Sequence, residues 1–226
     1  GLEITLPVSG TGLNIIVDWG DGTEETITTE FPTHTYAKAG VYEIAVIGKC
    51  PEWGYKESNP IGNQSKYYTY TQYLIGIKQW GELNATRYGF SKCINLKYVH
   101  GNATANTFLK LNDMTRMFCD CKSLQELDLS FINSSNVTWM DGVFAGCINL
   151  KSINLNNLNT SKVNNMSNMF SGCNSLKDLN LESFDTSSVK YMNTMFYGCN
   201  SLTKLDISNF VTNNVVGMTG MFKQCR

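Results

Sequence analysis

Residues 163–181 read VNNMSNMFSGCNSLKDLNL, and this stretch decides the fold of the C-terminal two-thirds of the chain. Its landmarks recur every 26 residues in two series, Phe118, Phe144, Phe170, Phe196 and Phe222, and Cys121, Cys147, Cys173, Cys199 and Cys225. An earlier copy, Phe90 with Cys93, lies 28 residues before the next one. Self-similarity at a fixed period indicates an array of stacked structural repeats.

Each unit contains two periodicities. Apolar residues of its first half are spaced i, i+3, i+4 and i+7, as in Met166, Met169, Phe170 and Cys173. This spacing favours a short helix with one buried face. In the second half Leu179 and Leu181 alternate with polar residues, which is typical of a strand with one buried face. Since one unit cannot bury its apolar face alone, the pattern predicts an α/β solenoid with 26-residue repeats.

The repeat also resembles known families. The spacing of Leu124, Leu127 and Leu129 resembles a leucine-rich repeat, and the run Phe170, Cys173 and Leu176 is similar to the BspA-like subgroup of bacterial surface proteins. The resemblance covers residues 74–226 and implies a cell-surface or secreted protein that adheres to host proteins or other cells. Apolar residues stand where the commoner leucine-rich repeats carry an Asn ladder: Ile132, Leu158, Phe184 and Phe210. We therefore expect an apolar spine to replace side-chain amides there.

Residues 1–50 follow a different pattern. The apolar run 14–19, the turn dipeptide Asp21-Gly22 and the alternating segment 41–47 predict a small antiparallel β-sandwich. The segments VDWGDGT (17–23), HTY (34–36) and AGVY (39–42) resemble the PKD family of Ig-like extracellular domains, which implies a spacer or an interaction module.

The acidic residues Asp18 and Asp21 of this turn allow two interpretations. Short carboxylates in a turn favour side-chain-to-backbone hydrogen bonds. A cation site is the alternative, although the spacing does not fit an EF-hand loop.

Residues 51–73 form a tyrosine-rich connection. We interpret it as a cap over the open end of the solenoid, because stacked repeats need one. Alternatively, Tyr55, Tyr67, Tyr68 and Tyr70 form a ligand surface, since tyrosine combines a large ring with a hydroxyl group.

Four cysteines at 26-residue steps predict an inward-facing row of buried thiols, each packed as a small hydrophobic side chain: Cys121, Cys147, Cys173 and Cys199. A row spreads its sulfurs along one axis, which disfavours a tetrahedral zinc site. Cys50 and Cys119 lie outside the row, and a bridge between them stays open.

Composition limits the classes of function. The net charge is −1, with 18 Lys and Arg against 19 Asp and Glu. This balance gives nucleic-acid binding no electrostatic driving force. There is no apolar run of the roughly 18 residues that span a bilayer. No catalytic or cofactor motif accompanies the two histidines, so we expect neither an enzyme nor a cofactor. Arg226 falls in mid-repeat, and we expect the native chain to continue beyond it.

The predicted strands present a candidate binding surface. Residues between buried leucines point outward onto the concave sheet. One predicted column holds Glu126, Ser152, Asp178 and Lys204, and a second holds Asp128, Asn154, Asn180 and Asp206, with Ser130, Asn156, Glu182 and Ser208 beyond them. We expect these columns to bind a host or cell-surface protein. The alternatives are a glycan-capturing accessory protein that uses the connection tyrosines, and a structural spacer.

Overall fold

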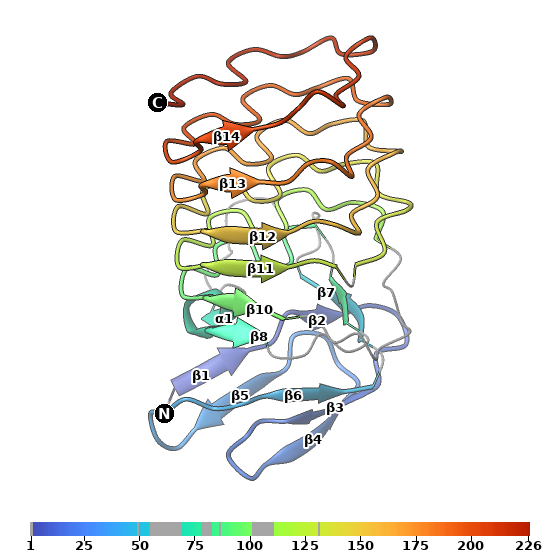
Figure 1. Ribbon diagram of the computed structural model, residues 1–226. Helices are drawn as coiled ribbons and strands as arrows, with labels where there is room; N and C mark the ends of the chain where they lie inside the picture. Colours follow the sequence, from blue (N-terminus) through green and yellow to red (C-terminus); the bar gives the residue numbers. More distant parts are fainter. Residues whose placement is uncertain are drawn as a thin grey trace.

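The computed structural model describes residues 2–48, 50–54, 69–77, 83–85, 87–100, 111–130 and 132–226. Within these residues the protein is mostly sheet, with short strands grouped into five small sheets. Their only helix is α1 (Thr69–Tyr73). The antiparallel N-terminal strands lie at one end of an elongated molecule, and the repeats are stacked from there towards the C-terminus (Figure 1).

Two antiparallel sheets form the N-terminal part. Strand β1 (Leu2–Thr5) pairs with β5 (Thr33–Tyr36), and β3 (Ile15–Asp18) lies between β4 (Glu24–Ile27) and β6 (Ala45–Ile47). The predicted Asp21-Gly22 turn is confirmed, because it connects β3 to β4 and Gly22 has a φ of 94°. The strand predicted at 41–47 is shorter than expected and covers only its last three residues.

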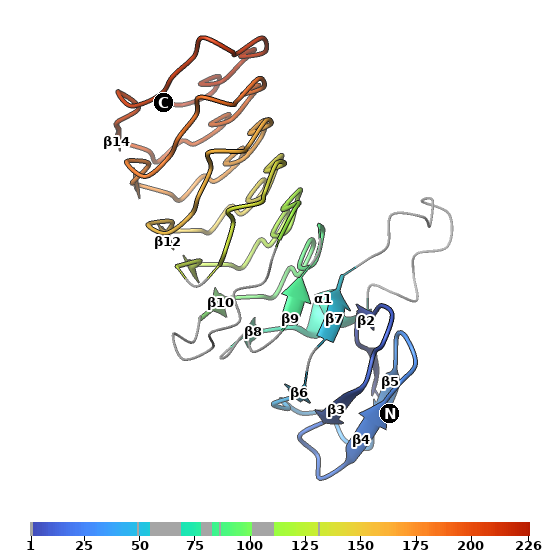
Figure 2. The same cartoon turned by 90° about the vertical axis from the view of Figure 1, so that its right-hand side faces the viewer.

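A third sheet connects the N-terminal part to the repeats. Strand β7 (Cys50–Trp53) pairs antiparallel with β2 (Val8–Ser9) and parallel with β9 (Leu83–Ala85), and Figure 2 shows it between them. The Trp53 ring stacks on Phe90 of the repeats at 6.0 Å. The prediction of a separate two-sheet sandwich is therefore wrong: its strands belong to several small sheets, one of which is completed by β9. The proposed boundaries at residues 50 and 73 stay a prediction.

The repeats form two parallel sheets. One contains β8 (Gly76–Ile77), β10 (Tyr98–Val99), β11 (Glu126–Asp128) and β12 (Ser152–Asn154), and the other contains β13 (Asp178–Leu179) and β14 (Lys204–Leu205). Strands do form where the alternating pattern predicts them. Each is only two or three residues long.

The predicted helices are absent from the described repeats, so the α/β leucine-rich-repeat solenoid is wrong. Residues 166–173, which we call the turn segment together with their equivalents in other repeats, form consecutive turns. The physical reason is a pair of left-handed residues four positions apart, Asn168 (φ 59°) and Gly172 (φ 75°). The same two positions have positive φ in the other repeats that follow residue 111: Arg116 and Asp120, Gly142 and Gly146, Thr194 and Gly198, and Gly220 and Gln224. Left-handed residues interrupt a right-handed helix.

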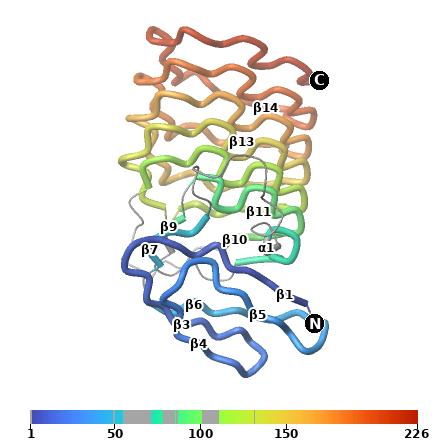
Figure 3. Tube along the Cα trace, turned by 180° about the vertical axis from the view of Figure 1, so that it is seen from behind, coloured from blue at the N-terminus to red at the C-terminus, as the bar shows by residue number. Residues whose placement is uncertain are grey.

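Hydrogen bonds in the turn segment confirm that it is not helical. Alternate N–H groups donate to the next repeat, as from Asn168 to the Asn193 carbonyl (2.8 Å) and from Phe170 to Met195 (2.9 Å). The intervening N–H groups close local turns, as from Cys173 to the Phe170 carbonyl (3.1 Å). In an α-helix, these N–H groups would instead donate to carbonyl groups four residues earlier in the same segment. The backbones of neighbouring repeats follow each other closely when viewed from behind (Figure 3).

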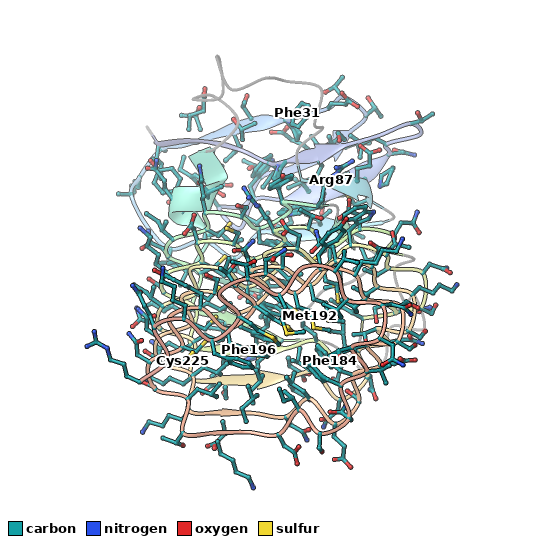
Figure 4. All side chains as sticks on the ribbon, turned by 90° about the horizontal axis from the view of Figure 1, so that it is seen from above. Phe31, Arg87, Phe184, Met192, Phe196 and Cys225 are labelled. Atoms are coloured by element: carbon teal, nitrogen blue, oxygen red, sulfur yellow. The ribbon has the colours of Figure 1, made fainter. Side chains whose placement is uncertain are left out.

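A continuous aromatic and sulfur core runs through the stack. Phe118, Phe144, Phe170 and Phe196 are fully buried, and consecutive rings stack with centroids 5.4 to 6.2 Å apart. Figure 4, which looks down the stack, shows Phe196 inside the outline of the backbone. All eight cysteines are free thiols, so the predicted row is confirmed and Cys50 is not bridged to Cys119.

The thiols of the row have specific partners. Each donates to the carbonyl of a phenylalanine in the preceding repeat, such as Cys173 to Phe144 at 3.3 Å and Cys199 to Phe170 at 3.2 Å. A cysteine thus fills a small apolar space and also gives a weak donor to a buried carbonyl.

Candidate binding groove on the repeat sheet

The first predicted column lies on the strands of the repeats, and the second lies at the strand ends or, for Asn180 and Asp206, directly after them. In the first, Glu126 pairs in register with Ser152, and Asp178 pairs with Lys204. These four side chains are exposed, while Leu127 and Leu179 between the columns are buried. The alternation of the sequence therefore placed the polar side chains on the outer face correctly.

The second column has a structural role. Its side-chain oxygens accept the backbone N–H two residues further along, in the pairs Asp128 with Ser130 (2.9 Å), Asn154 with Asn156 (3.2 Å), Asn180 with Glu182 (2.9 Å) and Asp206 with Ser208 (3.0 Å). Each bond forms an Asx turn that ends a strand. The amide of Asn154 also donates to Asp128 at 3.1 Å, which joins two repeats.

An open groove of about 460 Å³ lies over β13 and β14. We call it the repeat groove. It is lined by Asp178, Leu179, Asn180, Leu181, Glu182, Lys204, Asp206, Ser208 and Asn209. Four of the eight predicted column residues thus share one groove, whereas the other four lie on β11 and β12 outside it.

The repeat groove is acidic, with three carboxylates and one lysine along its walls. The pKa of Asp206 is lowered by the backbone N–H and the hydroxyl of Ser208, and also by the charge of Lys204. The Asp206 side chain is therefore a carboxylate at neutral pH. The leucines at positions 179 and 181 are almost fully buried and form an apolar floor.

Sequence reasoning missed Asn209. Its amide donates to the carbonyls of Leu181 (3.0 Å) and Phe184 (2.9 Å) in the preceding repeat, and so fixes one wall of the groove. Asn157 and Ser183 stand at equivalent positions and also donate to the preceding repeat. The apolar spine is present, but it does not replace a polar ladder, because the ladder lies one residue earlier. The available signal was the polar residue directly before three of the four spine residues, Leu158, Phe184 and Phe210.

Other candidate sites have different outcomes. Tyr55, Tyr67 and Tyr68 lie outside the described residues, as does the side chain of Tyr70. The acidic turn is held by side-chain-to-backbone bonds as predicted, from Gly20 N–H to Asp18 (2.8 Å) and from Thr23 N–H to Asp21 (3.1 Å). In the described part of the chain no group of three or more His, Cys, Asp or Glu residues is placed to hold a metal ion.

The comparison with protein families concerns the repeats. A family model described as "Mycoplasma protein of unknown function, DUF285" matches residues 112–226, just over half of the chain. The chain belongs to the DUF285 family. DUF285 is a bacterial surface-associated family of BspA-like repeat proteins, which confirms the coarser part of the resemblance. For this DUF285 chain the comparison finds neither a leucine-rich-repeat domain nor a PKD domain.

No curated protein and no solved structure matches the DUF285 chain. Among the residues that the structure describes, no helix has the length and apolar character needed to cross a bilayer.

Proposed function

We propose that this chain is a non-catalytic adhesion protein of the bacterial surface, and that its repeat groove binds a basic segment of a host or cell-surface protein. The observation that carries the proposal is the groove itself, which combines three carboxylates with an apolar floor. Sites that bind with specificity commonly combine apolar area with a few placed polar groups.

Charge and rigidity favour this ligand. Asp178 and Glu182 are exposed, so they can meet Lys or Arg side chains at little desolvation cost. Complementary charges at an exposed rim act mainly on the association rate and on specificity. The Asx turns at Asn180 and Asp206 hold the strand ends before a ligand arrives. A preorganised surface loses less entropy on binding.

The test is binding of the whole chain to an array of extracellular-matrix proteins and basic peptides. Asp178→Lys should weaken binding about tenfold or more, because it reverses a charge inside the groove. Glu24→Lys is the matched control: it changes the net charge equally, but its exposed side chain lies on β4, at the opposite end of the molecule (Figure 1). The proposal fails if both variants lose binding equally, or if neither does.

The alternatives stay predictions. Glycan capture through the connection tyrosines depends on residues outside the described part of the chain. A spacer role for a PKD-like N-terminal segment rests on its sequence motifs alone.

A further inference from the structure

Two exposed aromatic residues mark a second surface, distinct from the repeat groove. The side chains of Trp139 and Tyr191 are 45% and 40% exposed. They belong to a column of parallel bridges that runs Asp113, Trp139, Asn165, Tyr191 and Gly217. Along the chain, Trp139 stands midway between β11 and β12, so this column lies half a repeat away from the strands.

The column sets the distance between the two rings. Neighbouring backbones in parallel register are about 4.8 Å apart, and Trp139 and Tyr191 are two repeats apart, which separates their attachment points by about 10 Å. This distance is comparable to the length of a disaccharide in an extended glycan. Aromatic rings supply large, rigid contact area at low entropic cost.

Asn165 places a hydrogen-bond donor between the rings. Its Oδ1 atom accepts the N–H of Ser167 at 2.8 Å, which fixes the orientation of the amide. Its Nδ2 atom has no protein partner among the described residues. Two N–H donors are therefore available between two aromatic surfaces, where a sugar hydroxyl could accept them.

The next repeat supports the Tyr191 ring. A Cβ atom at Gly217 would lie 2.7 Å from Nδ2 of Asn193 and 3.1 Å from Cδ1 of Tyr191, so glycine at this position leaves room for both the Asn193 amide and the Tyr191 ring. A ring supported on one side loses little freedom when a ligand stacks on the other side.

The surroundings argue against other ligands. The backbone of the column is already hydrogen-bonded between repeats, as from Met166 N–H to the Tyr191 carbonyl (2.8 Å). A peptide ligand that binds as an added β-strand would therefore find these backbone groups already paired. Asp113 of the column lies 3.7 Å from Arg87, and nearby Asp141 lies 3.8 Å from Arg116, so arginines offset these two carboxylates. A neutral chain of sugars fits both conditions.

We propose that Trp139, Asn165 and Tyr191 form a stacking site for a neutral polysaccharide, with one sugar ring on each aromatic residue. The site is independent of the repeat groove, and neither proposal needs the other.

The test is affinity electrophoresis of the whole chain through native gels that contain neutral polysaccharides: hydroxyethyl cellulose, mixed-linkage β-glucan, xylan, galactomannan or glycogen. At least one should retard the chain. Trp139→Ala and Tyr191→Ala should each weaken that binding about tenfold, while Trp139→Phe, which keeps a ring, should stay within about threefold.

Two controls separate this site from general effects. Ile148→Ala removes an exposed apolar side chain outside the column and should leave binding unchanged. Asp178→Lys, in the repeat groove, should also leave it unchanged. Unfolding midpoints of all variants verify that they fold. Failure of every polysaccharide to retard the chain, or equal retardation of the Trp139→Ala/Tyr191→Ala double variant, overturns the proposal.

Discussion

At the residue scale, left-handed backbone positions decide the shape of each repeat. The spacing of Met166, Met169, Phe170 and Cys173 satisfies a helical face, and all four side chains are indeed buried. Asn168 and Gly172 nevertheless have positive φ, and they divide the segment into turns. The sequence contained this signal, because Gly146, Gly172 and Gly198 recur at the second position. The apolar spacing therefore identified the buried residues correctly, but it predicted a helix where the structure has consecutive turns.

Gly172→Ala isolates the cost of the left-handed conformation. An added Cβ would meet only Gly146 backbone atoms at 3.6 Å, which is ordinary contact, so steric overlap contributes little. We expect a loss of about 1–2 kcal/mol in the free energy of unfolding, measured by urea denaturation. Gly146→Ala should cost more, since its Cβ would also overlap the Asp120 carboxylate. Equal, negligible losses would contradict this explanation.

Asp21 should make the N-terminal turn sensitive to acid. Hydrogen bonds from Thr23 and then from His34 lower its pKa from 3.8 to about 2. A carboxylate with a lowered pKa stabilises the folded state above its unfolded pKa, and the contribution is lost as the pH falls from about 4 towards 2. Asp21→Asn should therefore flatten the stability profile in that window.

Glu24→Gln, at a nearby exposed carboxylate, is the control for the acid profile and should leave it unchanged. Circular dichroism during denaturation at several pH values measures both variants. An Asp21→Asn profile that parallels the wild type below pH 4 would show that the turn does not contribute.

At the scale of the element, the stacked phenylalanines hold neighbouring repeats together. Phe170 is fully buried between Phe144 and Phe196, at 5.4 and 5.8 Å. Phe170→Ala should cost about 3–5 kcal/mol, as large-to-small changes in a packed core do. Phe222, which is 46% exposed, stacks on Phe196 and should cost clearly less when replaced by alanine. Chemical denaturation compares the two, and similar losses would argue against the stack.

The row of thiols should be chemically inert in the folded protein. Burial raises the pKa of Cys93 and Cys121 well above its usual value. At pH 8 the thiols of Cys93 and Cys121 therefore hold their protons, and burial closes all of the fully buried thiols to reagents. We expect iodoacetamide to leave Cys93, Cys121, Cys147 and Cys173 unmodified until urea is added, as peptide mass spectrometry would show. Rapid native modification of Cys147 would contradict the burial.

The strands show how far sequence patterns predict an element. The alternation around Leu127 and Leu179 located β11 and β13 and the outward columns, because one buried face imposes a period of two. The alternation could not show that the side chains of the second column form Asx turns, because these hydrogen bonds depend on the conformation of the backbone after each strand. The groove residue Asn209 was missed for the same reason: its partners belong to the preceding repeat.

At the scale of the whole molecule, the 26-residue period predicted stacking, and buried residues do run continuously from Ile4 to Met221. The separate sandwich was wrong because β7 pairs with both β2 and β9, a long-range contact that no local pattern encodes. The position of the repeat groove over β13 and β14 likewise follows from how two repeats meet.

The repeat-to-repeat hydrogen bonds of the turn segments have a mechanical consequence. Pulled apart from its two ends, the stack can open one repeat at a time, because each repeat is held only by its neighbours. Every repeat that detaches frees 26 residues of chain, or about 90 Å when extended. A molecule that is held at one end and pulled at the other would therefore lengthen in equal steps, one repeat at a time. Each step would absorb part of the mechanical work done by the pulling force.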